Sequence, residues 1–134
     1  MRESDGGPAI DAKTLDQIAE RFRFRWDPPI LAVLADRALR FRAIHRQLEL
    51  TVGDHVDDNT LSRSLRRLIR VGHVTVETKR IGQRDFPFYG ITAAGREQLN
   101  TYRILILMFR HATRHSRDHD DRDRAAGGDS PWAA

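Results

Sequence analysis

The chain has 134 residues, which is enough for one globular domain with its own core and too few for two. It contains no cysteine, so disulfides, thiol redox sensing and thiolate metal sites are excluded. The formal net charge is +4, and only Lys13 and Lys79 among its 23 basic residues are lysines. An arginine excess indicates a polyanionic partner, although a genome rich in G and C favours the same bias for mutational reasons.

The sequence has no membrane segment and no catalytic motif. No signal peptide opens it, and the longest apolar run, residues 104–109, is far too short to span a bilayer. It has no nucleophile elbow, no HExxH, no phosphate-binding glycine loop and no paired-carboxylate motif. We therefore expect a cytoplasmic protein that is not an enzyme, contacts no membrane and holds no cofactor.

The first elements are a flexible arm and a short helix. Residues 1–12 are polar and contain glycines and a proline, which predicts the arm. Thr14 is a suitable N-cap for the helix that follows. Basic and aromatic residues then alternate from Arg21 to Trp26 and could stack on nucleic acid. Burial of Phe22 and Trp26 in the core is the favoured interpretation.

Two more helices are predicted next. Asp27 and the two prolines after it form a helix start, and this helix is apolar around most of its circumference as far as Ala38. We expect it to be buried at the centre of the domain. Residues 41–50 form a third helix with one apolar stripe, and residues 51–55 supply a turn that contains Gly53.

Residues 56–72 predict an amphipathic helix with a cationic side, bounded by Asp57 as N-cap and Gly72 as C-cap. Its apolar stripe consists of Leu61, Leu65, Leu68 and Ile69. Three arginines fall opposite that stripe and a fourth flanks it: Arg63, Arg66 and Arg70, and then Arg67. An ordinary basic surface helix is the alternative interpretation. A guanidinium group, however, pairs well with phosphate oxygens and guanine edges.

After this helix the apolar period changes from 3.6 to 2, which is typical of β-strands. Residues 73–78 and 86–91 predict an antiparallel hairpin. The segment between the strands holds three basic residues: Lys79, Arg80 and Arg84. A helix-turn-helix followed by a basic hairpin is a winged helix. We therefore predict a mainly α (α+β) fold, a winged helix-turn-helix domain over residues 13–111 with a two-stranded β wing.

A last helix is predicted over residues 92–111, with Thr92 as its cap. Its end is apolar all round, and one domain could cover it on one side only. We therefore predict a homodimer in which N- and C-terminal helices flank the domain and form the contacts. The predicted dimer residues are Tyr102, Leu105, Met108 and Phe109. The alternative is a terminal helix packed wholly into its own core.

Residues 112–134 lose the apolar period and mix charges, which predicts a disordered tail. His111, His115 and His119 are spaced by four, but residues eight apart lie about 12 Å apart along a helix and cannot share one ion. His45 is expected at the surface, and His73 just after a helix end. The sequence therefore predicts no metal site.

Four segments resemble HxlR-type bacterial winged-helix regulators, in the same order. Trp26–Leu34 resembles that family's tryptophan followed by an apolar helix, and LRFRAIHRQL (39–48) is similar to its RRFGELRRAL helix. VDDNTLSRSLRRLIRVGHVTVE (56–77) follows its ISPRTLSRRLRELEEAGLVERR pattern, and YGITAAGREQL (89–99) follows its YSLTPLGRALL pattern. MarR-type winged helices share a looser version. The resemblance implies a dimeric DNA-binding transcriptional regulator whose terminal helices form the dimer and whose recognition helix is residues 59–70.

The sequence also departs from that family. Its members often carry a cysteine near the tryptophan, and none exists here, so a thiol-sensing mechanism is ruled out. Asp58 and Asn59 stand where a proline and commonly an arginine are found, which places an acid near the phosphates. Phe88 replaces a polar residue on the wing strand, and its ring is expected to face a dimer partner or a ligand.

Taken together, the sequence predicts a sequence-specific transcriptional regulator that binds double-stranded DNA as a homodimer, with helices 58–71 in successive major grooves. The predicted DNA-binding residues are Asn59, Thr60, Ser62, Arg63, Arg66, Arg67, Arg70, Lys79, Arg80 and Arg84. Arg63 and Arg66 are the best candidates for base contacts. The alternative is a winged-helix dimer that binds a protein partner without reading DNA, which Asp58 and an exposed Phe88 suggest. A small-molecule effector is neither supported nor excluded.

Overall fold

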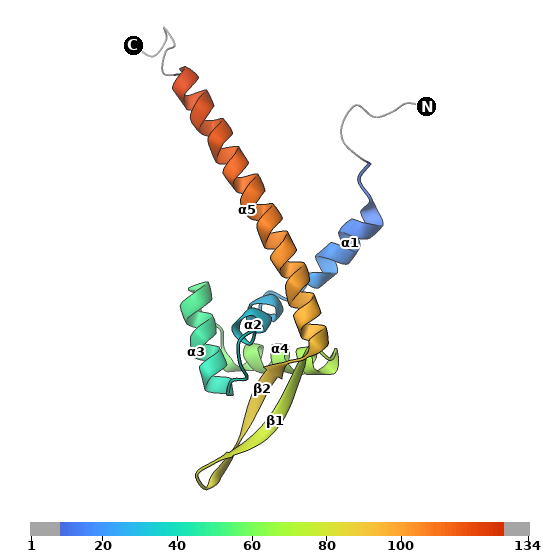
Figure 1. The fold of residues 1–134 in the computed structure, drawn as a ribbon, viewed down its shortest axis with the longest axis vertical. Helices are drawn as coiled ribbons and strands as arrows, with labels where there is room; N and C mark the ends of the chain where they lie inside the picture. Colours follow the sequence, from blue (N-terminus) through green and yellow to red (C-terminus); the bar gives the residue numbers. More distant parts are fainter. Residues whose placement is uncertain (1–8, 128–134) are drawn as a thin grey trace. The chain divides into compact units, whose positions relative to one another are not determined.

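The computed structural model describes residues 9–127 and divides the chain into two units, Met1–Arg96 and Glu97–Ala134. Within residues 9–127, five helices and one antiparallel hairpin follow one another (Figure 1). They are α1 (Ala12–Arg21), α2 (Asp27–Val33), α3 (Phe41–Val52), α4 (Asp58–Arg70), β1 (Val74–Ile81), β2 (Arg84–Ile91) and α5 (Ala93–Gly127). The predicted α+β class with a two-stranded wing is confirmed.

The core of the first unit lies where α2 packs against both α3 and α4. Its largest fully buried side chains are Ile30, Leu31, Leu34, Ile44, Leu48, Val56 and Leu61. The predicted burial of α2 is confirmed, but the helix ends at Val33 and does not reach Ala38. The reason is that the chain then pairs with the wing, where the backbones of Leu39 and Tyr89 exchange two hydrogen bonds of 2.9 and 2.8 Å.

Helix α1 begins earlier than predicted, because Asp11 and not Thr14 is its N-cap. The Asp11 carboxylate accepts hydrogen bonds from the backbone N–H groups of Lys13 and Thr14. Residues 1–8 of the predicted arm lie outside the described residues. The expected burial of Trp26 is confirmed, but Phe22 is 45% exposed and its predicted place in the core is wrong. No residue of α1 is buried, so its apolar side chains meet solvent.

The wing is longer and its turn tighter than predicted. The two strands pair from Val74 opposite Ile91 to Ile81 opposite Arg84 (Figure 1). Gly82 begins the two-residue turn with φ 65°, in the left-handed region that glycine adopts without strain. The basic residues predicted for a loop, Lys79, Arg80 and Arg84, therefore lie on strands.

The start of α5 is fixed by Thr92 and Gly95. The Thr92 hydroxyl accepts a hydrogen bond of 3.0 Å from the Gly95 N–H and donates one of 2.6 Å to the Gly72 carbonyl, which confirms the predicted cap. A Cβ at Gly95 would lie 2.2 Å from the backbone oxygen of His73. The chain therefore needs glycine at position 95 so that the helix start can lie against the wing.

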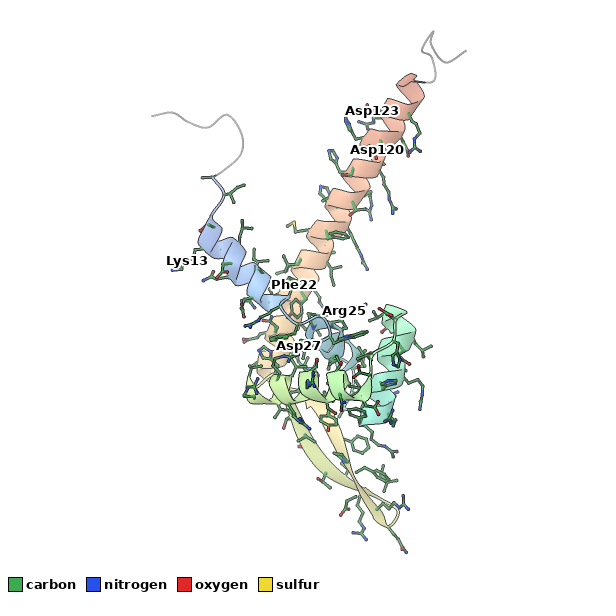
Figure 2. All side chains as sticks on the ribbon, turned by 180° about the vertical axis from the view of Figure 1, so that it is seen from behind. Lys13, Phe22, Arg25, Asp27, Asp120 and Asp123 are labelled. Carbon is green, nitrogen blue, oxygen red and sulfur yellow. The ribbon has the colours of Figure 1, made fainter. Side chains whose placement is uncertain are left out.

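Helix α5 continues to Gly127, so the predicted disorder is wrong for residues 112–127; residues 128–134 lie outside the described part. A polar contact one helical turn apart supports this part of the helix, since His119 Nε2 lies 3.4 Å from the Asp123 carboxylate. Figure 2 shows side chains projecting all along this helix. In the described part of the chain, no helix combines the length and apolarity that crossing a bilayer requires.

The predicted dimer residues of α5 differ in exposure. Met108 and Phe109 are exposed and Leu105 is half-buried. Tyr102, by contrast, is buried. Its place at a dimer interface stays a prediction. The same stretch exposes three further large apolar side chains: Ile104, Ile106 and Leu107.

Candidate nucleic-acid interface

Helix α4 presents an apolar side to the protein and an arginine side to solvent. The buried side consists of Leu61, Ser64, Leu65 and Leu68. Arg63, Arg66 and Arg70 are exposed, and within residues 9–127 none of these guanidinium groups forms a salt bridge or a side-chain hydrogen bond. The three positive charges are therefore available to an external anion. We call these three residues the arginine row.

The ends of α4 explain why the helix starts and stops where it does. Asp57 caps it by accepting a 2.7 Å hydrogen bond from the Thr60 N–H, and this bond lowers the pKa of the Asp57 carboxyl. Gly72 adopts φ 85° just after the helix, and the His73 N–H donates to the Leu68 carbonyl at 2.9 Å. The predicted N-cap is confirmed. The C-cap is Val71, one residue before the predicted Gly72, and Gly72 supplies the left-handed conformation that follows it.

Arg67 does not belong to the arginine row. Its guanidinium donates to both carboxylate oxygens of Asp27, at 2.9 and 2.8 Å, and its Cζ lies 3.5 Å from the centroid of the Phe24 ring. The Arg67 and Asp27 side chains are only 19% and 14% exposed. The prediction of Arg67 as a DNA contact therefore conflicts with the structure, where this residue ties α4 to α2.

The remaining predicted contacts on α4 surround its first turn. Asn59 is exposed, whereas Thr60 and Ser62 are half-buried. The Thr60 N–H is occupied by the Asp57 cap, but its position at the helix start is compatible with a contact to a phosphate.

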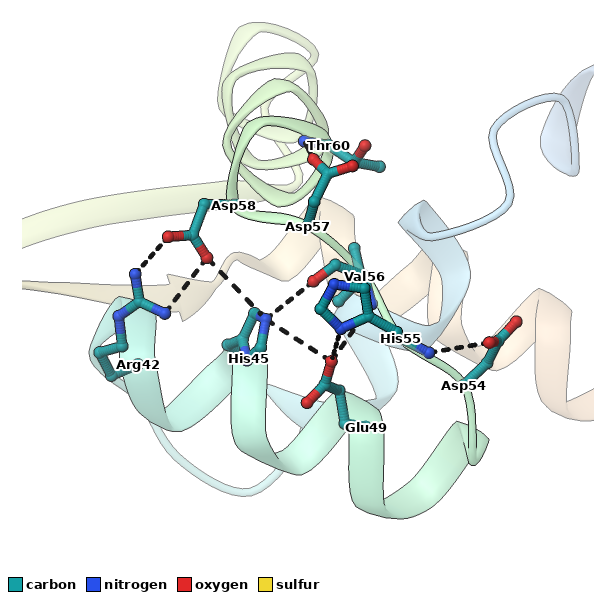
Figure 3. A network of polar contacts seen from close by, with 9 residues as sticks. All are labelled: Arg42, His45, Glu49, Asp54, His55, Val56, Asp57, Asp58 and Thr60. Carbon is teal, nitrogen blue, oxygen red and sulfur yellow. Dashed lines mark hydrogen bonds and ion pairs between the residues drawn. The ribbon is translucent and has the colours of Figure 1, made fainter.

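The acid at the start of α4 is paired with an arginine that sequence analysis did not single out. Arg42 on α3 donates from both of its terminal nitrogens to the Asp58 carboxylate (Figure 3). This hydrogen bonding, with the positive charge of Arg42, lowers the pKa of Asp58. The positive charge of Arg42 therefore balances the negative charge at the start of α4. No pattern in the sequence identified the partner, because it lies 16 positions earlier on another helix.

Arg42 belongs to a group of arginines on and next to α3. A shallow hollow beside β2 is lined by Leu39, Arg40, Arg42, Ala43, Arg46 and Phe88. Arg40, Arg42 and Arg46 are all exposed, so the positive surface extends beyond α4. The i, i+4 spacing of Arg42 and Arg46 places both side chains on one face of a helix, and this spacing could have indicated the positive surface from the sequence.

His45 is not the surface residue that the sequence predicted. Its side chain is 17% exposed, and Nε2 lies 2.8 Å from the Val56 carbonyl oxygen (Figure 3). His73 is half-buried directly after the glycine that ends α4, as expected of a residue at that place.

The wing places three cations on its two strands. Lys79, Arg80 and Arg84 are exposed, with one loose ion pair of 3.8 Å between Arg80 and Asp85. The Lys79 Nζ lies 5.0 Å from the centroid of the Phe88 ring. Phe88 is therefore half-buried on its own wing, and its predicted exposure is wrong. The wing surface is cationic and carries little open aromatic area.

No protein-family model matches the sequence, and neither does any curated protein sequence. Solved structures do match. A protein from Enterococcus faecalis V583 assigned to the MarR family of transcriptional regulators matches with TM-score 0.66 at 16% identity, over 85% of this chain and 99% of that one. A PadR family transcription regulator from Clostridium difficile R20291 matches with TM-score 0.61 at 13% identity, over 66% and 94%.

A third match is Bacillus subtilis PadR in complex with operator DNA, with TM-score 0.53 at 21% identity, over 58% of this chain and 47% of that one. At such low identity the likeness concerns the fold alone. The helix-turn-helix formed by α3 and α4, followed by the hairpin, is therefore a winged helix-turn-helix fold.

Proposed function

We propose that this protein is a DNA-binding transcriptional regulator that places α4 in the major groove of double-stranded DNA. The observation that carries the proposal is the arginine row, three exposed guanidinium groups on the side of α4 that faces away from the core. Guanidinium groups match phosphate oxygens and the O6 and N7 atoms of guanine. This function requires no catalytic group and no cofactor.

Arg63 and Arg66 are the proposed base-reading residues. Arg63 lies in the first half of α4, where a recognition helix contacts base edges, and Arg66 follows it on the same exposed side of the helix. Thr60 and Ser62 lie nearer to the backbone, and Asn59 and Arg70 extend the contact at either end. Replacement of Arg63 by alanine is expected to cost about 1–3 kcal/mol of discrimination between operator sequences if Arg63 reads a base. Unchanged sequence preference would remove Arg63 from that role.

The wing and α3 supply phosphate contacts in this proposal. Lys79, Arg80 and Arg84 add affinity that does not depend on base sequence and falls as salt rises. The arginines of α3, which the sequence analysis missed, add to the same positive surface. Arg67 is left out of the contact set because Asp27 occupies its guanidinium.

The protein is proposed to act as a homodimer. Helix α5 exposes Ile104, Ile106, Leu107, Met108 and Phe109 in one short stretch. Helix α1 separately exposes Leu15 and Ile18, and Phe22 directly after it is 45% exposed. Contiguous apolar surface of this kind is uncommon on monomers and is explained by burial in a two-fold interface. Two copies of α4 would then enter successive major grooves about 10 bp apart.

The finer family assignment and the cellular setting are also proposals. The motif resemblance favours an HxlR-type regulator, and the matching structures named above include PadR and MarR family proteins. One of the matching structures, Bacillus subtilis PadR, is in complex with operator DNA. A regulator of this kind acts in the bacterial cytoplasm, where the chromosome is accessible.

The alternative function is a winged-helix dimer that binds a protein partner without reading DNA. Both of its supports are weaker in the structure, since Asp58 is paired with Arg42 and Phe88 is half-buried beside Lys79. The Asp58 side chain is nevertheless 53% exposed.

Selection of bound duplexes from a random DNA pool tests the proposal. The expected result is enrichment of an inverted repeat with half-sites about 10 bp apart. An R63A/R66A variant carried through the same selection is expected to lose that motif while keeping its fold by circular dichroism. Recovery of no common sequence by the unaltered protein would contradict sequence-specific binding.

A further inference from the structure

The turn between α3 and α4 holds a cluster of metal-binding side chains that contact with DNA does not require. His45 and Glu49 lie one helical turn apart on α3 and so share a face. His55 lies in the turn that leads to α4. One ligand atom from each of these three residues lies within 4.8 Å of the others (Figure 3).

The distances are close to those that one ion imposes. The Glu49 Oε2 atom lies 2.5 Å from His55 Nδ1 and 3.7 Å from His45 Nε2. Zinc binds imidazole nitrogen and carboxylate oxygen at about 2.0–2.2 Å, so two ligands of one ion lie at most about 4 Å apart. The His55 side chain is 75% exposed and can turn without disturbing the core. A coordination site forms when the exposed His55 side chain moves and the His45 ring turns Nε2 away from the Val56 carbonyl.

Neighbouring groups hold the His55 backbone and the Glu49 side chain. The Asp54 carboxylate accepts a 2.8 Å hydrogen bond from the backbone N–H of His55 and a second one of 2.8 Å from Arg25. The backbone N–H of Val56 donates to Glu49 Oε2 at 3.3 Å. A hydrogen bond to a metal-ligating carboxylate fixes the direction of that ligand and raises affinity.

Protons now occupy the positions that an ion would take. The Val56 carbonyl oxygen can only accept, so His45 Nε2 donates its hydrogen to it, and a proton lies between His55 Nδ1 and Glu49. To bind an ion, each ring must carry its remaining proton on the other nitrogen and present a lone pair. The Val56 carbonyl then loses its hydrogen bond, which is the cost that the ion must offset.

We propose that His45, Glu49 and His55 form a binding site for a divalent transition-metal ion of the Zn²⁺ class. A set of two imidazoles and one carboxylate binds such ions in preference to Mg²⁺ and Ca²⁺, which favour oxygen ligands. The fourth position is open to water or to Asp58, whose Oδ1 lies 3.9 Å from His45 Nε2. The ion ties α3 to the residues just before the cap of α4. The site stands independently of whether α4 binds DNA.

Titration of the full chain, without a polyhistidine tag and freed of metal by a chelator, tests the site. Calorimetry with Zn²⁺ is expected to give one tight site per chain, and Co²⁺ is expected to change its visible spectrum as nitrogen replaces water. Bound Zn²⁺ is also expected to raise the melting temperature. Exposed His55 and solvent-accessible Glu49 allow H55A and E49Q, which leave the core intact; each is expected to weaken binding at least about tenfold.

The three histidines of α5 provide a matched control. An H111A/H115A/H119A variant removes exposed histidines only and is expected to bind Zn²⁺ as the unaltered chain does. Three results would overturn the proposal. The first is that the unaltered chain binds Zn²⁺ no more tightly than in the millimolar range. The second is that H55A and E49Q bind Zn²⁺ as tightly as the unaltered chain, and the third is that the α5 variant loses binding.

Discussion

Arg67 and Asp27, forty positions apart, form a two-bonded ion pair that joins α4 to α2, with both side chains largely buried. Arg67 also donates to Ser64, the buried polar residue on the inner side of α4, at 3.0 Å. Arg67 thus fixes α4 against α2, whereas the three arginines of the arginine row remain accessible to a ligand. The position of the arginine row therefore depends on this pair.

Replacement of Asp27 by alanine is expected to lower the free energy of unfolding by about 1–3 kcal/mol, because the charge of Arg67 is left without its partner in a partly buried place. Urea denaturation measures the change. The matched control is D85A, which removes the loose, exposed partner of Arg80 and is expected to change stability by less than about 0.5 kcal/mol. Equal changes in the free energy of unfolding for D27A and D85A would show that the burial of the Arg67–Asp27 pair adds nothing to stability.

Replacement of Gly95 by alanine is expected to destabilise the protein by about 1–3 kcal/mol, since the new Cβ collides with the His73 backbone oxygen. Without that collision, replacement of glycine by alanine in a helix would stabilise the protein by up to about 1 kcal/mol. The sign of the change in the free energy of unfolding therefore shows whether the collision occurs. The control is G90A, whose Cβ meets its nearest atom at an ordinary 3.6 Å. Thermal unfolding distinguishes the two.

The pKa of Asp58 is expected to lie below its ordinary value of 3.8, because Arg42 donates hydrogen bonds to the charged carboxylate. A lowered pKa means that the pair stabilises the folded state above pH 3.8 and that this contribution is lost as the pH falls through the folded-state value. NMR titration of the carboxyl carbon measures it. Replacement of Arg42 by glutamine is expected to raise the pKa of Asp58 toward 3.8; no movement would contradict the pairing.

Replacement of Asp58 by asparagine is expected to strengthen binding to any duplex, because it removes a negative charge near the phosphates and frees Arg42. The slope of log K against log salt is expected to steepen by about one unit as Arg42 gains a phosphate. Anisotropy titrations over a range of salt concentrations measure both quantities. A weaker complex would mean that Asp58 positions Arg42 for DNA, which is the opposite of competing with it.

Local patterns were sufficient to predict most of the fold. The apolar period, the caps Asp57, Gly72 and Thr92, and the switch to strand alternation identified four of the elements nearly in place. The end of α2 was missed because Leu39 leaves the helix to pair with Tyr89, a contact fifty positions away. The length of α5 was missed because its second half has no apolar stripe and consists of exposed polar and charged residues.

The candidate interface was predictable only in part, for a related reason. A helical wheel gives the direction of Arg63, Arg66 and Arg70, which is enough to place them on the surface. It cannot tell that Arg67 meets Asp27 or that Arg42 meets Asp58, because those partners come from other helices. The cluster of His45, Glu49 and His55 was invisible for the same reason, since the turn brings His55 back over α3.

The central claim is that the arginine row binds DNA, and fluorescence anisotropy with a labelled duplex at two salt concentrations tests it most directly. We predict that affinity falls steeply with salt and that R63A/R66A weakens binding at least about tenfold. A charge-matched control, R117A/R122A on exposed positions of α5, is predicted to change affinity far less. Weak binding whose affinity does not change with salt concentration would contradict DNA binding by the arginine row. An equal loss of affinity in R63A/R66A and R117A/R122A would contradict it as well.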